Sequence, residues 1–274
     1  MKKFVCAVVT GASSGLGKEF ALTLGKHGCS RMLLVARRLE RLETLAQELR
    51  SQDGEIQVEI LPVDLSLDEG RLAITAKLVS LNWEPDLLIN NAGLGDYGTL
   101  DSADWQRVDL VLQTNITALT HLCQLLSPGM IERGRGAILN VSSIASFLPL
   151  PSFAVYAASK AYVTSFSEAL RQELHPHGVR VHTLCPGPVP TEFGAVAERE
   201  AGGPRWHQPK ALQLSAERVV REGLHSVQID RPLLIPGWLL WFGMTMLGAL
   251  PRPVRRWMIG LSYRVQFSKA NHPA

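Results

Sequence analysis

The chain has 274 residues, which is long enough to bury a large core, and we expect one large α/β domain because no linker-like segment interrupts it. Its composition, 46% hydrophobic and 19% charged with glycine and proline spread along the chain, excludes a largely disordered protein. The net charge of +3 is small and no basic run is interleaved with aromatic residues, so nucleic-acid binding is not expected.

The N-terminus and the cysteines indicate a reduced, cytoplasmic protein. The apolar run at residues 4–9 is too short for a signal peptide, and we interpret it as a first buried strand. Cysteines occur far apart, with no CxxC pair and no Cys/His cluster, at Cys6, Cys29, Cys123 and Cys185. We therefore expect buried thiols and no metal site.

Short apolar runs alternate along the chain with stretches of helical period, which is typical of a parallel sheet covered on both faces. The predicted strands are residues 4–9, 31–36, 58–63, 86–90, 137–142, 179–184 and 233–236. The predicted helices are residues 15–28, 39–50, 67–81, 102–131, 153–174 and 216–227. Residues 186–209 carry five prolines and are expected to form a long loop, and loops of this length in compact domains are often lids. The fold class is therefore α/β, a doubly wound sheet of about seven strands.

A glycine-rich turn follows the first predicted strand, at Thr10-Gly11-Ala12-Ser13-Ser14-Gly15-Leu16-Gly17. Glycine lets the backbone turn sharply and approach a ligand, and the N-terminus of a helix offers free N–H groups and a partial positive charge to a pyrophosphate. A glycine turn alone is weak evidence, and a plain turn is the alternative. Its place after the first strand of an alternating chain favours a dinucleotide site.

Two arginines stand at the end of the second strand, where an acidic side chain would hold the ribose 2′-hydroxyl of NAD. Arg37 is suited to pair bidentately with a 2′-phosphate, and Arg38 supplies a second cation. The alternative is that both residues open the following helix on its solvated side. We predict NADP in preference to NAD.

Polar residues also follow the third and fourth strands. Asp64 is placed either to receive the adenine amino group or to cap the next helix, and the sequence leaves both open. Residues 90–93 read NNAG, which puts polar and small residues where the sheet meets a crevice, although a simple turn has the same composition.

The stretch Tyr156-Ala157-Ala158-Ser159-Lys160 puts a phenol and an ammonium four residues apart, on one face of a helix. A tyrosine has an ordinary pKa near 10, and a nearby ammonium and the cationic ring of an oxidised nicotinamide both favour the phenolate. We therefore expect a lowered pKa for Tyr156, which suits general acid/base catalysis. The alternative is an aromatic residue at the core boundary beside a solvated lysine.

Together these residues resemble the short-chain dehydrogenase/reductase family. The shared motifs, in the family's order and spacing, are TGASSGLG at 10–17, NNAG at 90–93, Asn115, Ser143, Tyr156-x-x-x-Lys160, and Pro186-Gly187 followed by Thr191. The likeness covers roughly residues 3–236. It implies a Rossmann-like fold, an NAD(P)-dependent oxidoreductase and a homo-oligomer.

The resemblance also implies a role for each catalytic residue. Tyr156 would be the general acid/base and Lys160 its electrostatic partner. Ser143 would hold the substrate oxygen, and Asn115 would anchor a water that leads to Lys160. Ser142 is also a hydroxyl at this strand end, but the register 13 residues before Tyr156 favours Ser143.

The same resemblance implies a cofactor site. It places the pyrophosphate and ribose at the glycine turn, the adenine-side ribose at Asn91 and Gly93, and the nicotinamide carboxamide at Thr191. The predicted cofactor-binding residues are Gly11, Ser13, Ser14, Gly15, Leu16, Gly17, Arg37, Arg38, Asp64, Leu65, Asn91, Ala92, Gly93, Tyr156, Lys160, Pro186, Gly187, Val189 and Thr191. Relatives that prefer NADP often have a basic residue at the position of Ser14, so here Arg37 is expected to carry the preference.

The family fold does not account for the last part of the chain. From Arg231 onward there are six basic residues and no acidic one, and residues 233–250 carry no charge. That run reaches the lower length limit for a membrane span, but Pro236-Gly237 interrupts it and leaves about 14 residues. We expect residues 1–236 to form the catalytic domain and residues 237–274 an extension packed on it. A pocket wall, a subunit contact and a peripheral membrane contact helped by the basic cluster at 252–256 all stay open.

We predict an NADP-dependent oxidoreductase that interconverts a carbonyl and a secondary alcohol, on an apolar small-molecule substrate. Two alternatives are a catalytically silent dinucleotide-binding protein and a membrane-associated, lipid-directed reductase. The joint presence of Ser143, Tyr156, Lys160 and Asn115 counts against the silent protein, because binding alone needs none of them.

Overall fold

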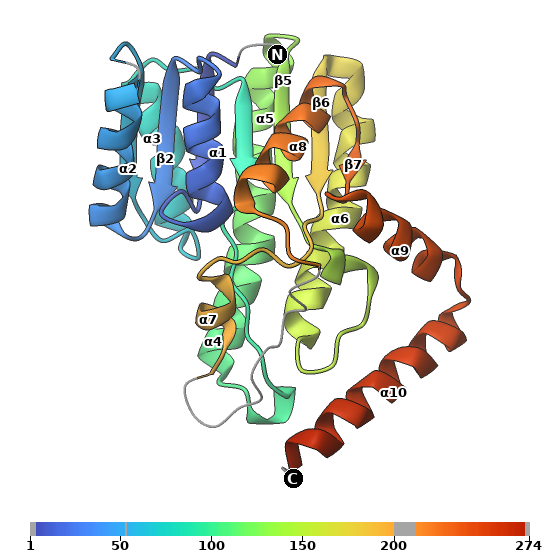
Figure 1. The fold of residues 1–274 in the computed structure, drawn as a ribbon. Helices are drawn as coiled ribbons and strands as arrows, with labels where there is room; N and C mark the ends of the chain where they lie inside the picture. Colours follow the sequence, from blue (N-terminus) through green and yellow to red (C-terminus); the bar gives the residue numbers. More distant parts are fainter. Residues whose placement is uncertain (1–3, 53, 200–211, 272–274) are drawn as a thin grey trace.

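Seven parallel strands form a single twisted sheet with the order β3-β2-β1-β4-β5-β6-β7 (Figure 1). The structure is a computed structural model and describes residues 4–52, 54–199 and 212–271. The strands are β1 (Cys6–Thr10), β2 (Arg31–Ala36), β3 (Gln57–Pro62), β4 (Leu87–Asn90), β5 (Gly136–Val141), β6 (Val179–Leu184) and β7 (Leu233–Leu234). The predicted Rossmann-like, doubly wound fold is confirmed.

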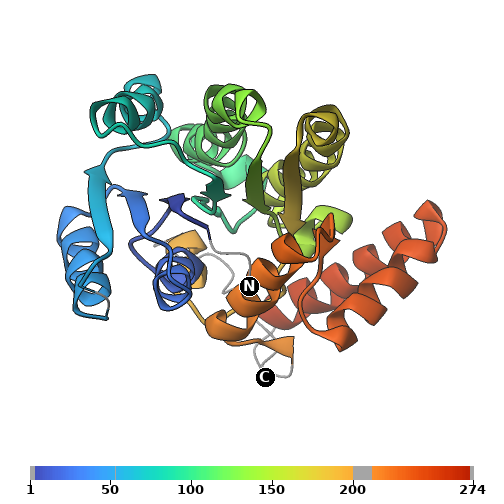
Figure 2. The same cartoon turned by 90° about the horizontal axis from the view of Figure 1, so that it is seen from above.

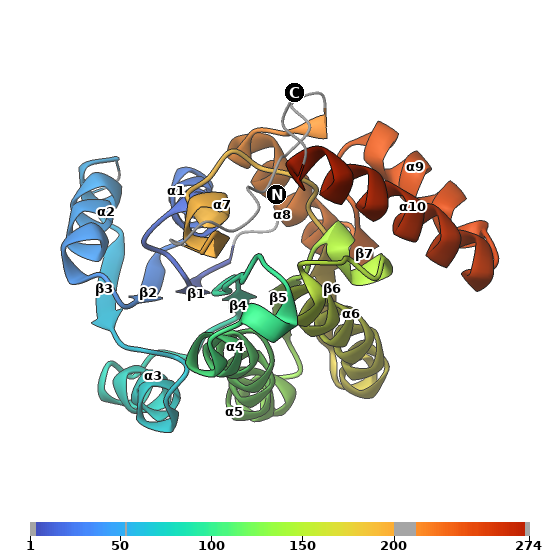
Figure 3. The same ribbon diagram turned by 90° about the horizontal axis from the view of Figure 1, so that it is seen from below.

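Helices cover both faces of the sheet (Figures 2 and 3). The helices around the sheet are α1 (Gly15–Lys26), α2 (Leu39–Gln52), α3 (Asp68–Ser80), α4 (Trp105–Leu112), α5 (Leu119–Glu132), α6 (Ala154–Leu174) and α8 (Ala216–Gln228). One core joins Ala7 and Val9 of β1 to α1, α2 and α8, and the other joins Cys6 and Val8 to α3, α5 and α6. Strands β1 and β4 are buried along their whole length, which is why their residues are almost all apolar.

The crossover connection after β3 determines where a crevice forms at the edge of the sheet. Strand β1 pairs with β2 on one side and with β4 on the other, so the connection through α3 reverses the direction in which strands are added. At such a switch point the loops after β1 and β4 diverge and leave a crevice at the carboxyl ends of the strands. The glycine turn after β1 and NNAG after β4 therefore face each other.

The predicted helix at 102–131 was wrong as one continuous element. The chain forms a short 3₁₀ turn, η1 (Leu100–Ser102), then α4, then a π-helical segment, η2 (Gln113–Ala118), and then α5. A π-helical segment inserts a wider turn without changing the apolar period of its flanks, so the sequence pattern does not reveal it. The wider turn contains Asn115.

The predicted long loop at 186–209 also needs correction. Residues 193–197 form a short helix, α7 (Phe193–Ala197), and Glu198 makes a parallel bridge with Tyr97. Pairing with the distant segment around Tyr97 orders this stretch, and no local signal foretells it. The remainder of the prediction, residues 200–209, lies outside the described residues.

The C-terminal part forms two helices after β7, α9 (Trp238–Ala249) and α10 (Arg252–Asn271). Leu240 is the buried residue of α9, and it packs with Cys185 and Ile235 in a small cluster beside the sheet. Figure 1 shows that α9 leaves the body of the molecule and that α10 turns back toward the end where the strands terminate. Within the described ranges, no helix combines the length and the apolarity that a membrane crossing needs.

The cysteines behave as the sequence predicts, since all four are free and buried. Burial raises the pKa of Cys6, Cys29 and Cys123 to about 12 and that of Cys185 to about 11. Thiols with such values carry almost no thiolate at neutral pH and are poor nucleophiles. They are core residues in this fold.

Buried His182 on β6 makes the stability depend on pH. It is fully buried, and its Nδ1 lies 2.9 Å from the carbonyl oxygen of Arg231. Burial is the largest cause that lowers its pKa from 6.5 to about 4. Below pH 6.5 the histidine takes up a proton in the unfolded chain but stays neutral in the folded chain. Its contribution to the free energy of unfolding is therefore complete above pH 6.5 and is lost as the pH falls toward 4.

We expect the protonation of His182 in the unfolded chain to lower the free energy of unfolding by about 2 kcal/mol between pH 7 and pH 5. Urea unfolding at both pH values measures it, and His182→Gln should remove most of the difference. His177→Gln, at an exposed histidine, is the matched control and should leave the difference unchanged. Equal pH dependence in wild type and His182→Gln would contradict the assignment.

Candidate active site

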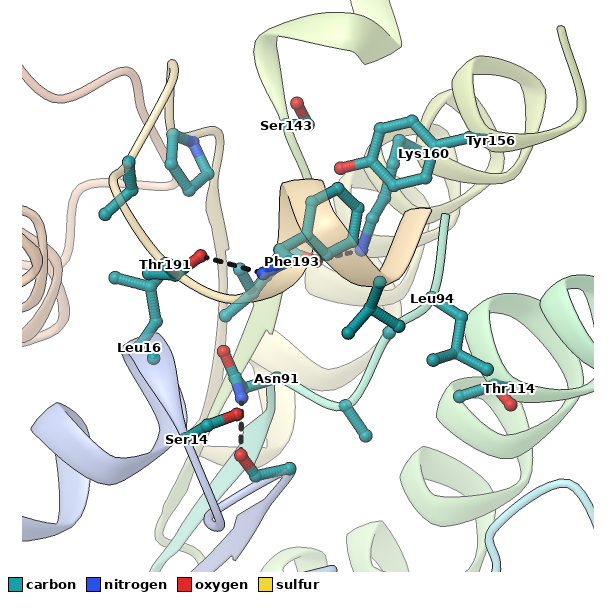
Figure 4. Close-up of a pocket in the computed structure, with 18 of the residues that line it drawn as sticks. Ser14, Leu16, Asn91, Leu94, Thr114, Ser143, Tyr156, Lys160, Thr191 and Phe193 are labelled. Atoms are coloured by element: carbon teal, nitrogen blue, oxygen red, sulfur yellow. Dashed lines mark hydrogen bonds between the residues drawn. The ribbon is translucent and has the colours of Figure 1, made fainter. Parts of the chain in front are cut away.

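A cavity of about 480 Å³ opens at the carboxyl ends of the strands, within the range of roughly 300–1,000 Å³ that ligand pockets occupy. It collects most of the residues that the sequence singled out. They are Gly11, Ser13, Ser14, Gly15, Leu16, Arg37, Arg38, Asp64, Leu65, Asn91, Ala92, Gly93, Ser143, Tyr156, Lys160, Pro186, Gly187, Val189 and Thr191. In Figure 4, Tyr156, Lys160 and Phe193 lie at one end of the cavity, and Ser14 and Asn91 lie at the other.

The glycine turn forms one wall of the cavity. Gly11 has a φ of +65°, which side chains rarely allow, and its neighbour in space is the end of β4. Gly17 does not line the cavity; a Cβ there would lie 2.1 Å from the carbonyl oxygen of Gly11, so only glycine lets α1 approach the turn. The first turn of α1 has no side-chain cap, which leaves its N–H groups to an anionic ligand.

Thr10 ties the two sides of the switch point together. Its hydroxyl donates to the carbonyl oxygen of Ile89 and accepts from the N–H groups of Asn91 and Ala92. The Asn91 side chain in turn donates to the carbonyl oxygen of Thr10, 3.0 Å away. These bonds fix the backbone of residues 90–93 against the glycine turn. The amide side chain of Asn91 therefore holds the ends of β1 and β4 together.

The two arginines after β2 have different surroundings. Arg37 lies 3.7 Å from a carboxylate oxygen of Asp64, while Arg38 donates to the hydroxyls of Ser13 and Ser14. The other Asp64 oxygen accepts from the N–H and the hydroxyl of Ser66, so Asp64 closes a local turn and is not the N-cap of α3. Arg38 therefore sits directly over the glycine turn.

Glu192 was missed by the sequence reasoning. Its carboxylate accepts from Arg38 at 3.0 Å and from Arg41 at 2.7 and 2.8 Å, and it lines the cavity next to Thr191. Hydrogen bonding from Arg41, then from Arg38, lowers the pKa of this carboxyl. In the sequence this position shows only an acidic residue after Thr191. Its contact with Arg41 of α2 depends on the path of the loop after β6 and cannot be predicted locally.

Tyr156 and Lys160 both lie on α6 and line the same cavity. The Lys160 ammonium is 5.8 Å from the centre of the Tyr156 ring, and it donates to the carbonyl oxygen of Val141 at 2.9 Å. The ring is stacked on Phe153 with centroids 4.5 Å apart. The shared face that the i, i+4 spacing predicts is present, and both residues are buried, not at a solvated boundary.

The expected lowering of the Tyr156 pKa was wrong for the protein alone. Burial raises the pKa of Tyr156 to about 12, and the Ser143 hydroxyl acts in the opposite direction. Burial also lowers the pKa of Lys160 to about 8. Desolvation is the largest cause of both shifts, because each group loses water from its charged form when it is buried. At neutral pH the phenol is protonated.

Ser143 and Ser142 have separate environments. The Ser142 hydroxyl is buried and bonds to the carbonyl oxygen of Lys160 and to Thr164, so it is a structural residue. Ser143 caps the 3₁₀ helix η3 (Ile144–Phe147), where its hydroxyl accepts from the N–H of Ala145, and it lines the cavity. This difference favours Ser143 as the hydroxyl that contacts a substrate.

Asn115 is buried behind the cavity and not in its wall. Its side chain exchanges two hydrogen bonds with the backbone of Leu94 and donates to the hydroxyl of Ser159. A Cβ placed on Gly93 would lie 3.3 Å from both the Asn115 oxygen and the Lys160 ammonium. The π-helical turn thus brings Asn115 to the rear of Lys160.

Apolar side chains form the wall of the cavity around Tyr156 and Lys160, and the sequence did not predict them. They are Leu94, Ile144, Leu148, Leu150, Phe153, Phe193 and Val196. Phe193 on α7 lies 5.3 Å from the Tyr156 ring, centre to centre. Because these residues come from three separate segments, which follow β4, β5 and β6, no period in the sequence connects them.

A buried carboxylate, Asp96, links the segment of α7 to the loop after β4. Asp96 accepts two bonds from Arg199, at 2.9 and 2.7 Å, and lies 3.0 Å from Arg107. Arg107 also donates to the carbonyl oxygens of Val196 and Glu198. These contacts join the loop after β4 to the segment that carries Phe193.

The comparison with protein families decides the identity. Residues 5–201 match the model of the short chain dehydrogenase family, which is most of the described sheet and of the cavity wall. The chain belongs to this family. It is an NAD(P)-dependent oxidoreductase, as the motifs around the glycine turn and Tyr156 implied.

Individual relatives and solved structures also resemble this chain in sequence and fold. The chain is 34% identical over 247 residues to a very-long-chain 3-oxoacyl-CoA reductase of Phaeosphaeria nodorum, covering 88% of this chain and 72% of the relative. A Sphingobium yanoikuyae short-chain dehydrogenase solved with NADPH superimposes with a TM-score of 0.77 at 27% identity, over 90% of this chain and 96% of the other. A Burkholderia phymatum member solved with NAD gives a TM-score of 0.77 at 25% identity, over 89% and 94%.

Proposed function

We propose that this short-chain dehydrogenase uses NADP to interconvert a carbonyl and a secondary alcohol on an apolar substrate. The observation that carries the proposal is the layout of the cavity. One end has the glycine turn and Arg38, and the other has Tyr156, Lys160 and Ser143 inside an apolar wall. A charged or strongly polar substrate would lose its hydration there without gaining partners.

The residues present fit a dinucleotide. The uncapped first turn of α1 would hold the pyrophosphate, and Arg38 would pair with the 2′-phosphate of the adenine ribose. Thr191 lies against Gly15, where a Cβ would be 3.2 Å from the threonine side chain, so the loop after β6 covers the turn. The bound nicotinamide supplies the hydride.

The side chains handle the proton. In the reductive direction the Ser143 hydroxyl donates a hydrogen bond to the carbonyl oxygen, and the protonated phenol of Tyr156 gives that oxygen its proton as the hydride adds to the carbon. The raised pKa keeps the phenol protonated at neutral pH, so the proton is present on the phenol before the hydride adds. Lys160, 5.8 Å from the ring centre, stabilises the phenolate that remains.

A substrate screen tests the reaction. NADPH oxidation at 340 nm is followed with apolar ketones, aldehydes and acyl carbonyls, and with small polar carbonyls for comparison. We expect turnover with the apolar set and little with the polar set. Turnover of none of these carbonyls would instead support a dinucleotide-binding protein without catalysis, provided that NADPH binding is measured in parallel.

The cofactor preference gives a separate prediction at Arg38. Charge-assisted bonds to a phosphate contribute about 1.5–3 kcal/mol, so Arg38→Ala should raise KM for NADPH roughly 10- to 100-fold and leave KM for NADH nearly unchanged. Steady-state kinetics with both cofactors measure this. Glu192→Gln should lower KM for NADPH, because the carboxylate that competes for Arg38 and Arg41 is removed.

Arg37→Ala is the matched comparison for Arg38→Ala. The sequence assigned the preference to Arg37, whereas in the structure Arg37 lies beside Asp64 and Arg38 lies over Ser13 and Ser14. A larger NADPH defect in Arg37→Ala would restore the first assignment. Equal defects with NADPH and NADH in both variants would contradict a 2′-phosphate site at these arginines.

A further inference from the structure

The outer face of α9 is apolar although it is exposed. Leu240 is buried and Met244 packs in the same cluster, which defines the inner face of the helix. An ordinary surface helix would carry polar residues on its other side. Here the outer face bears Trp238, which is 75% exposed, and also Trp241, Phe242 and Met246.

Helix α10, which follows α9 directly in the chain, also exposes apolar side chains. Trp257, 69% exposed, and Leu261 lie four residues apart and therefore on one face of α10. We call Trp238, Trp241, Phe242, Met246, Trp257 and Leu261 the α9–α10 surface. None of these residues lines the cavity, so the surface is not a wall of the active site.

Basic residues accompany the aromatic ones. Arg252 and Arg256 are exposed at the start of α10, and Arg255 lies between them. In the part of the chain that the structure describes, none of the three forms an ion pair. From Arg231 to the end the sequence has no acidic residue at all. The surface is thus apolar and positively charged at once.

We propose that the α9–α10 surface docks on an anionic lipid bilayer. Tryptophan and phenylalanine partition into the boundary between head groups and acyl chains, and arginines beside them pair with anionic head groups. Helix α9 has 12 residues, a length of about 18 Å, so it lies in that boundary and does not cross a hydrocarbon core of about 30 Å.

The charge of this segment favours an anionic bilayer over a second copy of the chain as the binding partner of the α9–α10 surface. A two-fold contact uses the same patch on both subunits, so it would bring two arginine clusters together without acidic partners from this segment. An anionic bilayer supplies the missing negative charge. Helix α10 runs toward the end of the molecule where the strands terminate and the cavity opens (Figure 1).

Co-sedimentation of the full chain with vesicles tests the proposal without substrate or cofactor. Phosphatidylcholine vesicles with about 30% phosphatidylserine should carry the protein down at low salt, phosphatidylcholine alone should carry less, and added salt should release it. Trp241→Glu/Phe242→Glu should lower the partition coefficient at least tenfold. Arg252→Gln/Arg256→Gln should lower it about 30-fold on anionic vesicles and leave binding to neutral vesicles nearly unchanged.

Val79→Glu is the matched control, since it places a carboxylate at another exposed apolar residue, on α3. It should sediment like the wild type, and circular dichroism should show all variants folded. The proposal is overturned if the wild type stays in the supernatant with both vesicle types, or if the α9 variant and Val79→Glu bind equally. A dimer that light scattering shows to dissociate in Trp241→Glu/Phe242→Glu, with no vesicle binding, would make the surface a subunit contact instead.

Discussion

Tyr156→Phe is expected to lower kcat for carbonyl reduction by about 10³-fold or more while NADPH affinity changes less than about twofold. The substitution removes the proton that the substrate oxygen needs, and general acid catalysis is commonly worth 10²- to 10⁴-fold. The phenylalanine ring keeps the stacking on Phe153 at 4.5 Å, so the cavity wall is preserved. Stopped-flow turnover and fluorescence titration of NADPH measure the two quantities.

Tyr162→Phe is the matched control for this experiment. Tyr162 lies on the same helix, and its hydroxyl bonds to Thr120 at 2.9 Å outside the cavity. It should keep wild-type turnover and NADPH affinity. If Tyr156→Phe turned over at the wild-type rate, the acid would be another group and the proposed mechanism would be wrong; if only NADPH binding were lost, Tyr156 would be a cofactor residue.

Asp96→Ala is expected to lower the free energy of unfolding by about 3–5 kcal/mol, because it leaves Arg107 and Arg199 without the buried carboxylate between them. The same change frees α7, so Phe193 and Val196 no longer hold the apolar wall in place. We therefore also expect a higher KM for an apolar substrate. Urea unfolding and substrate kinetics measure these effects.

Asp101→Ala provides the control for Asp96→Ala. Asp101 is an exposed carboxylate on the same stretch of chain, and its removal should change the free energy of unfolding by less than about 0.5 kcal/mol. Equal stability of the two variants would show that the Asp96 ion pairs do not hold α7. A stability loss with an unchanged KM would confine the role of Asp96 to folding.

Much of the fold followed from the sequence because its signals are local. Buried strands and amphipathic helices have different apolar periods, so all seven strands lie close to their predicted ranges. The spacing of Tyr156 and Lys160 placed both on one helical face by geometry alone. The glycine turn was also recognisable from local sequence. Gly11 is required because its φ is positive, and Gly17 is required because α1 approaches the turn closely there.

The features that were missed depend on segments far apart in the chain. Glu192 reaches Arg38 and Arg41 because the loop after β6 crosses to α2, and Asp96 holds Arg199 from a distant loop. The π-helical turn at Asn115 leaves the apolar period of its neighbours intact, so it was predicted as an ordinary helix.

The amino-acid sequence by itself determined the family and the ranges of the strands, and it predicted the reacting side chains, because each rests on local period or spacing. Only the tertiary structure decided their protonation, since the pKa of Tyr156 depends on walls contributed by several loops. The same holds for α9, whose apolar outer face is visible only once Leu240 shows which side is packed. Burial is a property of the assembled chain, and charge and hydration follow it.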